Sequence, residues 1–178
     1  QIAQDYDLFA QSVTYFKLYN IPKALIEYRV HKDQITNKNH KEQKTWSNTI
    51  GIEYLRNLGI TNIEIPYISA YKKMLNFDYI SINIKDLWHL KETFELITRS
   101  NLEFSFFNHD RLLQVLAERW FICCYHSSTG INGYFLYNKS TLSKSYPLTR
   151  KSKAKFIIKK IFHSIKQTKN KCFKYYGI

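Results

Sequence analysis

Apolar residues recur at helical spacing through the middle of this 178-residue chain, and this pattern restricts the possible folds more than any other feature of the sequence. One helix is predicted to carry an apolar stripe that includes Trp46, Ile50 and Tyr54 and to end at Leu58, where Gly59 would stop it. A second begins at Asp86, whose carboxylate can cap its first turn, and a third spans about residues 110–125. We therefore expect residues 46–126 to form a helical extension.

The first thirty residues have a different pattern. A helix is predicted from about Tyr6 to Phe16, with Asp5 as its N-cap and an apolar stripe made of Leu8, Phe9, Val13 and Phe16. Extended chain follows from Tyr19 and is interrupted by Pro22. Residues 24–30 alternate imperfectly between apolar and polar side chains, which predicts a short strand buried on most of both faces.

The net charge of +13 is not spread evenly along the chain. Residues 1–118 hold 14 Lys/Arg and 14 Asp/Glu, whereas residues 119–178 hold 13 Lys/Arg and no acidic residue. A nucleic-acid-binding domain usually spreads its basic residues over the working face of the whole fold. A nucleic-acid partner is therefore not expected, and the basic C-terminal third needs an explanation of its own.

The C-terminal third divides into a predicted linker and a basic tail. Residues 127–148 are rich in Ser, Gly, Asn and Thr, which is typical of a linker, and residues 149–178 form the tail. Within Lys151–Asn170 one helical face is apolar and lysines occupy much of the rest; the apolar residues are Ala154, Ile158, Ile161, Phe162 and Ile165. Such a helix can lie in an anionic membrane interface. Equally, it can pack on the body of the protein with a solvated lysine face.

Cysteine and histidine spacing argues against a metal cluster. The three cysteines are too few and too irregularly spaced, and Cys123 and Cys124 are expected to be buried as small apolar side chains. The histidines at 40, 89, 109, 126 and 163 show no metal-ligand spacing and are interpreted as structural or solvated. No run of eighteen apolar residues occurs, so a membrane-spanning helix is not expected.

Three short motifs at the front carry a resemblance. They are Asp5-Tyr6-Asp7-Leu8-Phe9, then Tyr19-Asn20-Ile21-Pro22-Lys23-Ala24-Leu25, then Tyr28-Arg29-Val30-His31. In this order and at these spacings they resemble the second half of a family 2 glycosyltransferase domain of GT-A fold. The resemblance covers roughly residues 3–37.

The resemblance implies a fold class and a set of site residues. The fold would be an α/β fragment, mainly helical, in which residues 1–45 end a GT-A catalytic domain ahead of the helical extension. Asp5 aligns with the catalytic base, although Gln4 stands where Glu is more usual. Arg29 and His31 align with the basic pair near the donor diphosphate, and His31 is also a possible ligand of a divalent metal, Mg or Mn. Asp7 is a candidate for substrate binding, although a role in the first helical turn is the plainer interpretation.

These residue types suit an inverting displacement. An acceptor hydroxyl that attacks the anomeric carbon loses its proton as the new bond forms, and a positioned carboxylate such as Asp5 can accept it. The leaving nucleoside diphosphate gains negative charge, to which Arg29 can offer a bidentate fork. The two groups would serve opposite ends of one reaction.

The expected function is transfer of a sugar from a nucleotide-sugar donor to a saccharide or lipid-linked acceptor, as in bacterial cell-surface polysaccharide biosynthesis. The Asp-x-Asp metal motif and the donor pocket are expected upstream of this sequence, so the chain alone should be inactive. The expected location is cytoplasmic, with peripheral attachment to the inner face of the membrane. The alternative is a noncatalytic helical binding module with a basic tail that binds a membrane or nucleic acid.

Overall fold

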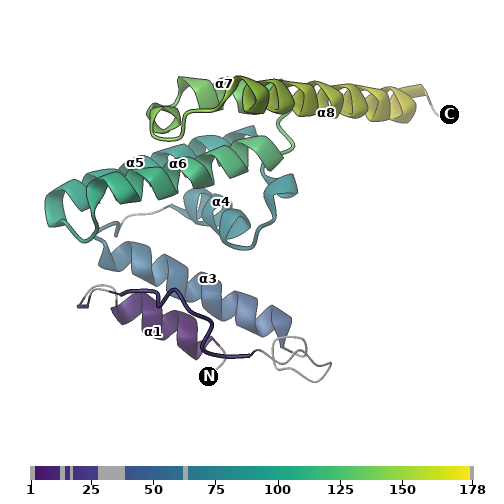
Figure 1. Cartoon of the computed structure of the whole chain (residues 1–178). Coiled ribbons are helices and arrows are strands. Elements are labelled where there is room, and N and C mark those ends of the chain that lie inside the picture. The colour runs from purple at the N-terminus through teal and green to yellow at the C-terminus, as the bar shows by residue number, and fades with distance from the viewer. Residues whose placement is uncertain (1–2, 13–14, 17, 28–38, 62–63, 177–178) are drawn as a thin grey trace. The chain divides into compact units, whose positions relative to one another are not determined.

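A computed structural model describes residues 3–12, 15–16, 18–27, 39–61 and 64–176, with side chains described up to residue 165 except at position 40. Every regular element within these ranges is a helix (Figure 1). The prediction of an α/β GT-A fragment is therefore wrong for the described residues. The part of the predicted strand that can be examined, residues 24–27, is neither helix nor strand.

Exposure explains why this segment forms no strand. Leu25 and Ile26 are 63% and 86% exposed, so no second strand or helix covers them. An extended segment needs a neighbouring strand to pair its backbone N–H and C=O groups, and the described residues supply none. The remaining residues of the predicted strand, 28–30, lie outside the described residues.

The chain divides into two compact units, Gln1–Thr61 and Asn62–Ile178, and each is described by itself. In unit 1, α1 (Gln4–Ser12) packs against α3 (His40–Asn57). Helix α1 begins before Asp5, which lies in its first turn and is not the N-cap that the sequence predicted. The prediction for the end of α3 is confirmed: Gly59 has a φ of 82°, and the N–H of Ile60 donates to the Leu55 carbonyl at 3.1 Å.

Helix α1 faces α3 in an orientation that the apolar pattern did not predict. Leu8 and Phe9, expected to belong to its buried stripe, are 64% and 59% exposed. The residues that line the space between the two helices are instead Ala3, Asp7, Ala10 and Gln11, which recur at helical spacing. A small and polar face of α1 is therefore turned toward α3.

Unit 2 is a helical bundle. Its elements are α4 (Ile65–Leu75), η1 (Tyr79–Ser81), α5 (Ile84–Phe104), α6 (His109–His126), α7 (Ile131–Lys139), η2 (Thr141–Lys144) and α8 (Arg150–Tyr176). Helix α5 packs against α4, α6 and α7, and α7 packs against α8. The buried core includes Leu90, Phe94, Trp120 and Phe156, and it also contains Cys123 and Cys124, whose burial confirms the prediction.

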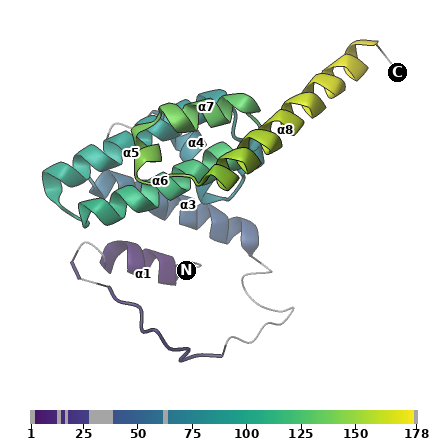
Figure 2. The same cartoon turned by 45° about the horizontal axis from the view of Figure 1, so that its top comes forward.

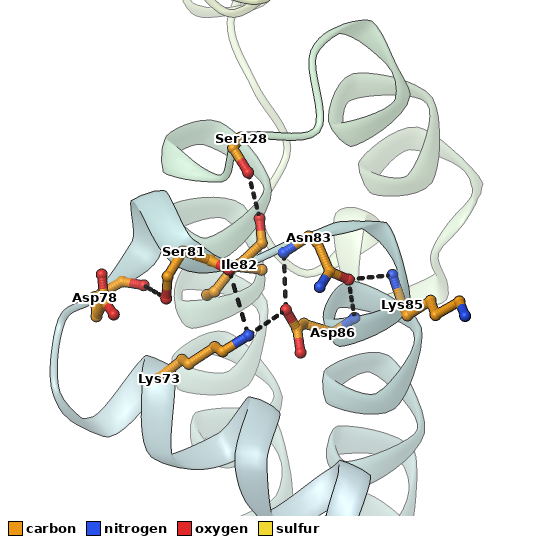
Figure 3. A network of polar contacts seen from close by, with 8 residues as sticks. All are labelled: Lys73, Asp78, Ser81, Ile82, Asn83, Lys85, Asp86 and Ser128. Carbon is orange, nitrogen blue, oxygen red and sulfur yellow. Dashed lines mark hydrogen bonds and ion pairs between the residues drawn. The ribbon is translucent and has the colours of Figure 1, made fainter.

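Polar contacts fix the start of α5 (Figure 3). The Asn83 side chain accepts from the N–H groups of Lys85 and Asp86, at 2.8 and 3.1 Å. The Asp86 carboxylate in turn accepts a hydrogen bond from the Asn83 N–H at 2.8 Å. It also forms an ion pair with Lys73 Nζ at 2.7 Å. The N-cap is therefore Asn83, three residues before the predicted Asp86, and Asp86 completes a capping box.

The predicted linker, residues 127–148, contains α7 and η2, which pack against α6. Tyr137 of α7 is 2% exposed and its hydroxyl donates to the Tyr146 carbonyl. Serine and asparagine in this stretch thus belong to short helices and their ends. No described helix is long and apolar enough to cross a membrane.

Candidate functional site

The structure describes two of the four residues that the resemblance assigned to a site. Asp5 and Asp7 both lie in the first turns of α1. Asp5 is exposed, whereas Asp7 is half-buried and accepts a hydrogen bond from Gln11 Nε2 at 2.8 Å. Arg29 and His31 lie outside the described residues, so their assigned contacts with a diphosphate or a metal stay predictions.

A cavity of about 420 Å³ lies within unit 1 between α1 and α3. Helix α1 and the residues beside it contribute Ala3, Asp7, Ala10, Gln11 and Tyr15 to its lining. Helix α3 contributes Trp46, Thr49, Ile50, Glu53, Tyr54 and Asn57. Asp5 is not among the lining residues, because side chains two apart on a helix point in different directions.

The lining combines hydrogen-bonding groups with aromatic surfaces. Asp7 and Glu53 supply carboxylates, and Gln11 and Asn57 supply amides that can donate and accept. The Trp46 side chain is 41% exposed, so part of its ring surface is open to a ligand. Such a wall suits a ligand that alternates hydroxyl groups with apolar ring faces.

Tyr54 contributes a hydroxyl that stays protonated at neutral pH. Burial, with a smaller effect from the nearby Tyr6, raises its pKa to about 12. A neutral phenol can donate a hydrogen bond as well as accept one. Tyr54 therefore adds a donor to a wall whose carboxylates only accept.

The described residues do not form a metal site. No group of three or more His, Cys, Asp or Glu side chains within the described ranges is close enough to hold an ion. Asp7 and Glu53 provide two carboxylates at the cavity, and His31 is outside the described residues. Binding of Mg or Mn by His31 therefore stays a prediction.

The chain matches no family model, no curated protein and no solved structure. Its function therefore has to be inferred from the residues of the site itself.

Sequence reasoning missed the α3 side of this cavity, although a signal was present. Trp46, Ile50 and Tyr54 were assigned to an apolar stripe of a helix. Thr49, Glu53 and Asn57 recur on the same helical face, three, seven and eleven residues after Trp46. A helical face that mixes aromatic and hydrogen-bonding side chains is a better signal of a binding wall than of a core.

Proposed function

We propose that this chain is the acceptor-binding part of an inverting glycosyltransferase, with Asp5 as the base that takes the acceptor proton. The observation that carries the proposal is the cavity between α1 and α3, whose carboxylates, amides and aromatic rings suit a saccharide. One wall of this cavity is formed by α1, the helix that also carries Asp5. The resemblance of residues 3–37 to family 2 glycosyltransferases adds to this support and does not depend on the cavity.

Asp5 and the cavity would divide the work between them. The cavity holds the sugar residues of the acceptor, and the reacting hydroxyl extends toward the N-terminal end of α1, where the exposed Asp5 carboxylate can reach it. The positive end of the helix dipole stabilises the ionised form of a carboxylate in the first turn.

Exposed apolar residues of unit 1 support a further protein surface beside it. Tyr19, Ile21 and Ile26 are 84%, 66% and 86% exposed. These three residues lie within one short segment of the chain, and contiguous exposed apolar surface commonly marks sites where protein surfaces meet. The occupant that fits the proposed reaction is the part of the enzyme that binds the nucleotide sugar.

Saccharide binding can be tested on the chain itself by saturation-transfer NMR with glucose, galactose, rhamnose, N-acetylglucosamine and lactose as probes. At least one probe is expected to bind, and Trp46→Ala should weaken that binding about three- to tenfold, because an aromatic face contributes about 0.5–1.5 kcal/mol. Trp88→Ala is the matched control, since Trp88 is similarly exposed, at 49%, but lies in unit 2. Binding that Trp88→Ala weakens as much as Trp46→Ala does would count against the cavity.

Helix α8 supports a second proposal, that the protein docks on an anionic membrane surface. The predicted apolar face of this helix is not its packing face: Phe156 and Lys160 are buried, at 0% and 1% exposure. A separate stripe faces solvent, with Ile158 at 54%, Ile161 at 46%, Phe162 at 62% and Ile165 at 47% exposure. The lysines at 151, 153 and 155 are exposed on the same helix.

The geometry of this stripe favours a bilayer over a solvated face. Residues 158, 161, 162 and 165 follow helical spacing, so they form one continuous row. Figure 2 shows that the C-terminal half of α8 extends beyond the other helices of unit 2. An exposed apolar row beside lysines, in a region without acidic residues, is complementary to the acyl boundary and headgroups of an anionic membrane.

Vesicle flotation tests this docking. The chain is expected to float with vesicles of phosphatidylcholine and phosphatidylglycerol and to float much less with phosphatidylcholine alone. The double variant Ile161→Ser/Ile165→Ser should lose most of this binding, whereas Leu102→Ser, at an exposed apolar position of α5, should keep it. Equal flotation of both variants would exclude the α8 stripe as the docking surface.

A further inference from the structure

A buried lysine in α8 lies at a small cavity formed by α6 and α8. The Lys160 side chain is among the largest fully buried side chains of the described residues, and the residue is 1% exposed. Its Nζ donates to the Ser127 carbonyl at 2.6 Å and to Ser127 Oγ at 3.2 Å. Ser127 is the C-cap of α6, so its carbonyl lies at the negative end of that helix. The Lys160 ammonium group has three N–H bonds, and among the described residues these two oxygens are its hydrogen-bond acceptors.

The bundle makes room for the lysine at Gly133 of α7. A Cβ at this position would lie 3.2 Å from Lys160 Cε, 2.6 Å from Thr129 Oγ1 and 2.8 Å from the Cys124 carbonyl. A larger residue would therefore displace the lysine stem or the backbone of α6. The path of Lys160 into the bundle depends on this close approach.

A second lysine and two histidines join Lys160 around the cavity, whose volume is about 260 Å³. Lys159 Nζ lies 3.2 Å from His126 Nδ1 and 3.8 Å from the centroid of the Tyr125 ring. His163, one turn further along α8, also lines the cavity. Four nitrogen-bearing side chains that can each carry a positive charge thus surround one space.

None of the described residues that line this cavity is acidic, so none offsets the charge. All of its lining residues fall within residues 119–178, a stretch that contains no Asp or Glu. Burial lowers the pKa of Lys160 to about 8, and the neighbouring Lys159 lowers it as well. Burial also lowers the pKa of His126, as do Lys159 and then Lys160. The site disfavours its own protonated forms until a negative charge enters it.

We propose that this cavity binds a phosphate group, as a monoester or a diphosphate, through Lys159, Lys160 and His126. A phosphate offers several strong acceptor oxygens and carries a charge that offsets both lysines. A lysine ammonium interacts with a phosphate as a compact point charge. Ser127 already holds the Lys160 ammonium in place at the cavity. This inference does not depend on glycosyl transfer.

A structural role for Lys160 is the competing explanation. The lysine would then only satisfy the carbonyl at the end of α6, and the cavity would hold water. If Lys160 is only structural, soluble phosphate does not bind in the cavity. If the cavity binds phosphate, the affinity depends on the protonation of Lys160 and therefore on pH.

Binding can be measured on the full chain by NMR, with inorganic phosphate and pyrophosphate as probes and the ring proton signals of His126 and His163 as reporters. Lys160→Met should weaken binding about tenfold or more, as the loss of a charge-assisted hydrogen bond predicts. Methionine has a similar unbranched shape and needs no partner, so the fold should persist, as the far-UV circular dichroism spectrum would show. Lys155→Met, at an exposed lysine of the same helix, is the control and should bind as the unchanged chain does.

The source of the phosphate is distinguished in a second arm. Monomeric dihexanoyl phosphatidic acid presents a lipid headgroup without a bilayer. Tighter binding of this probe than of pyrophosphate, with loss in Lys160→Met, would identify a lipid headgroup; the reverse order would identify a soluble phosphate compound. Failure of every probe to shift the histidine signals, or identical affinities in Lys160→Met and Lys155→Met, would overturn the proposal.

Sulfate provides the pH test, because its charge is constant between about pH 7 and 10. Its affinity should fall as the pH rises through about 8, where Lys160 loses its proton. The other titratable groups at the site are Lys159, whose pKa burial lowers, the two imidazoles, the Tyr125 phenol, and the Cys124 thiol, whose pKa burial raises well above its usual value. Lys160→Met should remove most of the decline near pH 8. An unchanged decline in this variant would assign the titration to Lys159 and contradict the role of Lys160.

Discussion

Asp5→Asn is expected to lower the turnover of glycosyl transfer about 10²–10⁴-fold in the whole gene product, because an amide cannot accept the proton of the acceptor hydroxyl. The affinity for the nucleotide sugar should stay the same, since the substitution does not change Arg29 or His31, the residues that the resemblance assigns to the donor diphosphate. The measurement is kcat with a saturating nucleotide sugar, together with donor affinity from calorimetry. A fall in kcat without a change in donor affinity is expected for a group that acts only in the chemical step.

Two further variants separate a base from a helix-stabilising residue. Asp5 lies in the first turn of α1, where a carboxylate favours the helix by about 0.3–1 kcal/mol. Asp110→Asn removes a carboxylate from the first turn of α6 and should reproduce this stability effect without changing turnover. Asp7→Asn should instead raise the KM of the acceptor, because Asp7 lines the cavity. Turnover that survives Asp5→Asn intact would favour the noncatalytic helical module.

The helical part of this fold could be predicted because its signals are local. Spacing of apolar residues located α3, α5, α6 and α8 to within a few residues of one or both of their bounds. Gly59 was identified correctly because a left-handed residue at the end of a helix is most often glycine. The start of α5 was misassigned to Asp86 because both Asn83 and Asp86 can cap, and only the geometry shows that the two side chains cap reciprocally.

The sheet could not be decided from the sequence alone. Residues 24–26 carry apolar side chains that suit a strand, but a strand exists only where a neighbour pairs with its backbone. Leu25 and Ile26 remain exposed in the described residues. A local pattern has no information on whether that neighbour is present.

The sequence pattern also did not predict which faces of the helices are buried. For this reason it indicated neither of the two cavities. The apolar stripe of α1 was expected to face inward, yet Phe9 is exposed. For α8, packing on the body and docking on a membrane were both left open, and Phe162 is exposed. In α8 a residue that packs inward is Lys160, because Ser127 accepts two hydrogen bonds from its ammonium group. Contacts between residues 33 positions apart, such as Lys160 with Ser127, are invisible to patterns of helical period.

Trp120→Ala is expected to reduce the free energy of unfolding of unit 2 by about 3–5 kcal/mol, the usual cost of truncating a fully buried large aromatic residue. Trp120 is 0% exposed, and its ring meets Phe94 of α5 edge to face, with 6.4 Å between centroids. Removing it opens a space that the packed pair α5 and α6 cannot close. Urea unfolding followed by circular dichroism measures the change, and hydrogen exchange of α5 and α6 amides assigns it to unit 2.

The indole N–H of Trp120 makes a more selective control possible. This group is buried without a hydrogen-bond partner among the described residues, which costs free energy in the folded state. Trp120→Phe removes the orphaned donor while keeping most of the ring, so its cost should stay below about 1.5 kcal/mol. Trp88→Ala, at a 49% exposed site on α5, should change stability by no more than about 0.5 kcal/mol. If Trp120→Ala were as mild as Trp88→Ala, the contact between α5 and α6 would not be the core of the bundle.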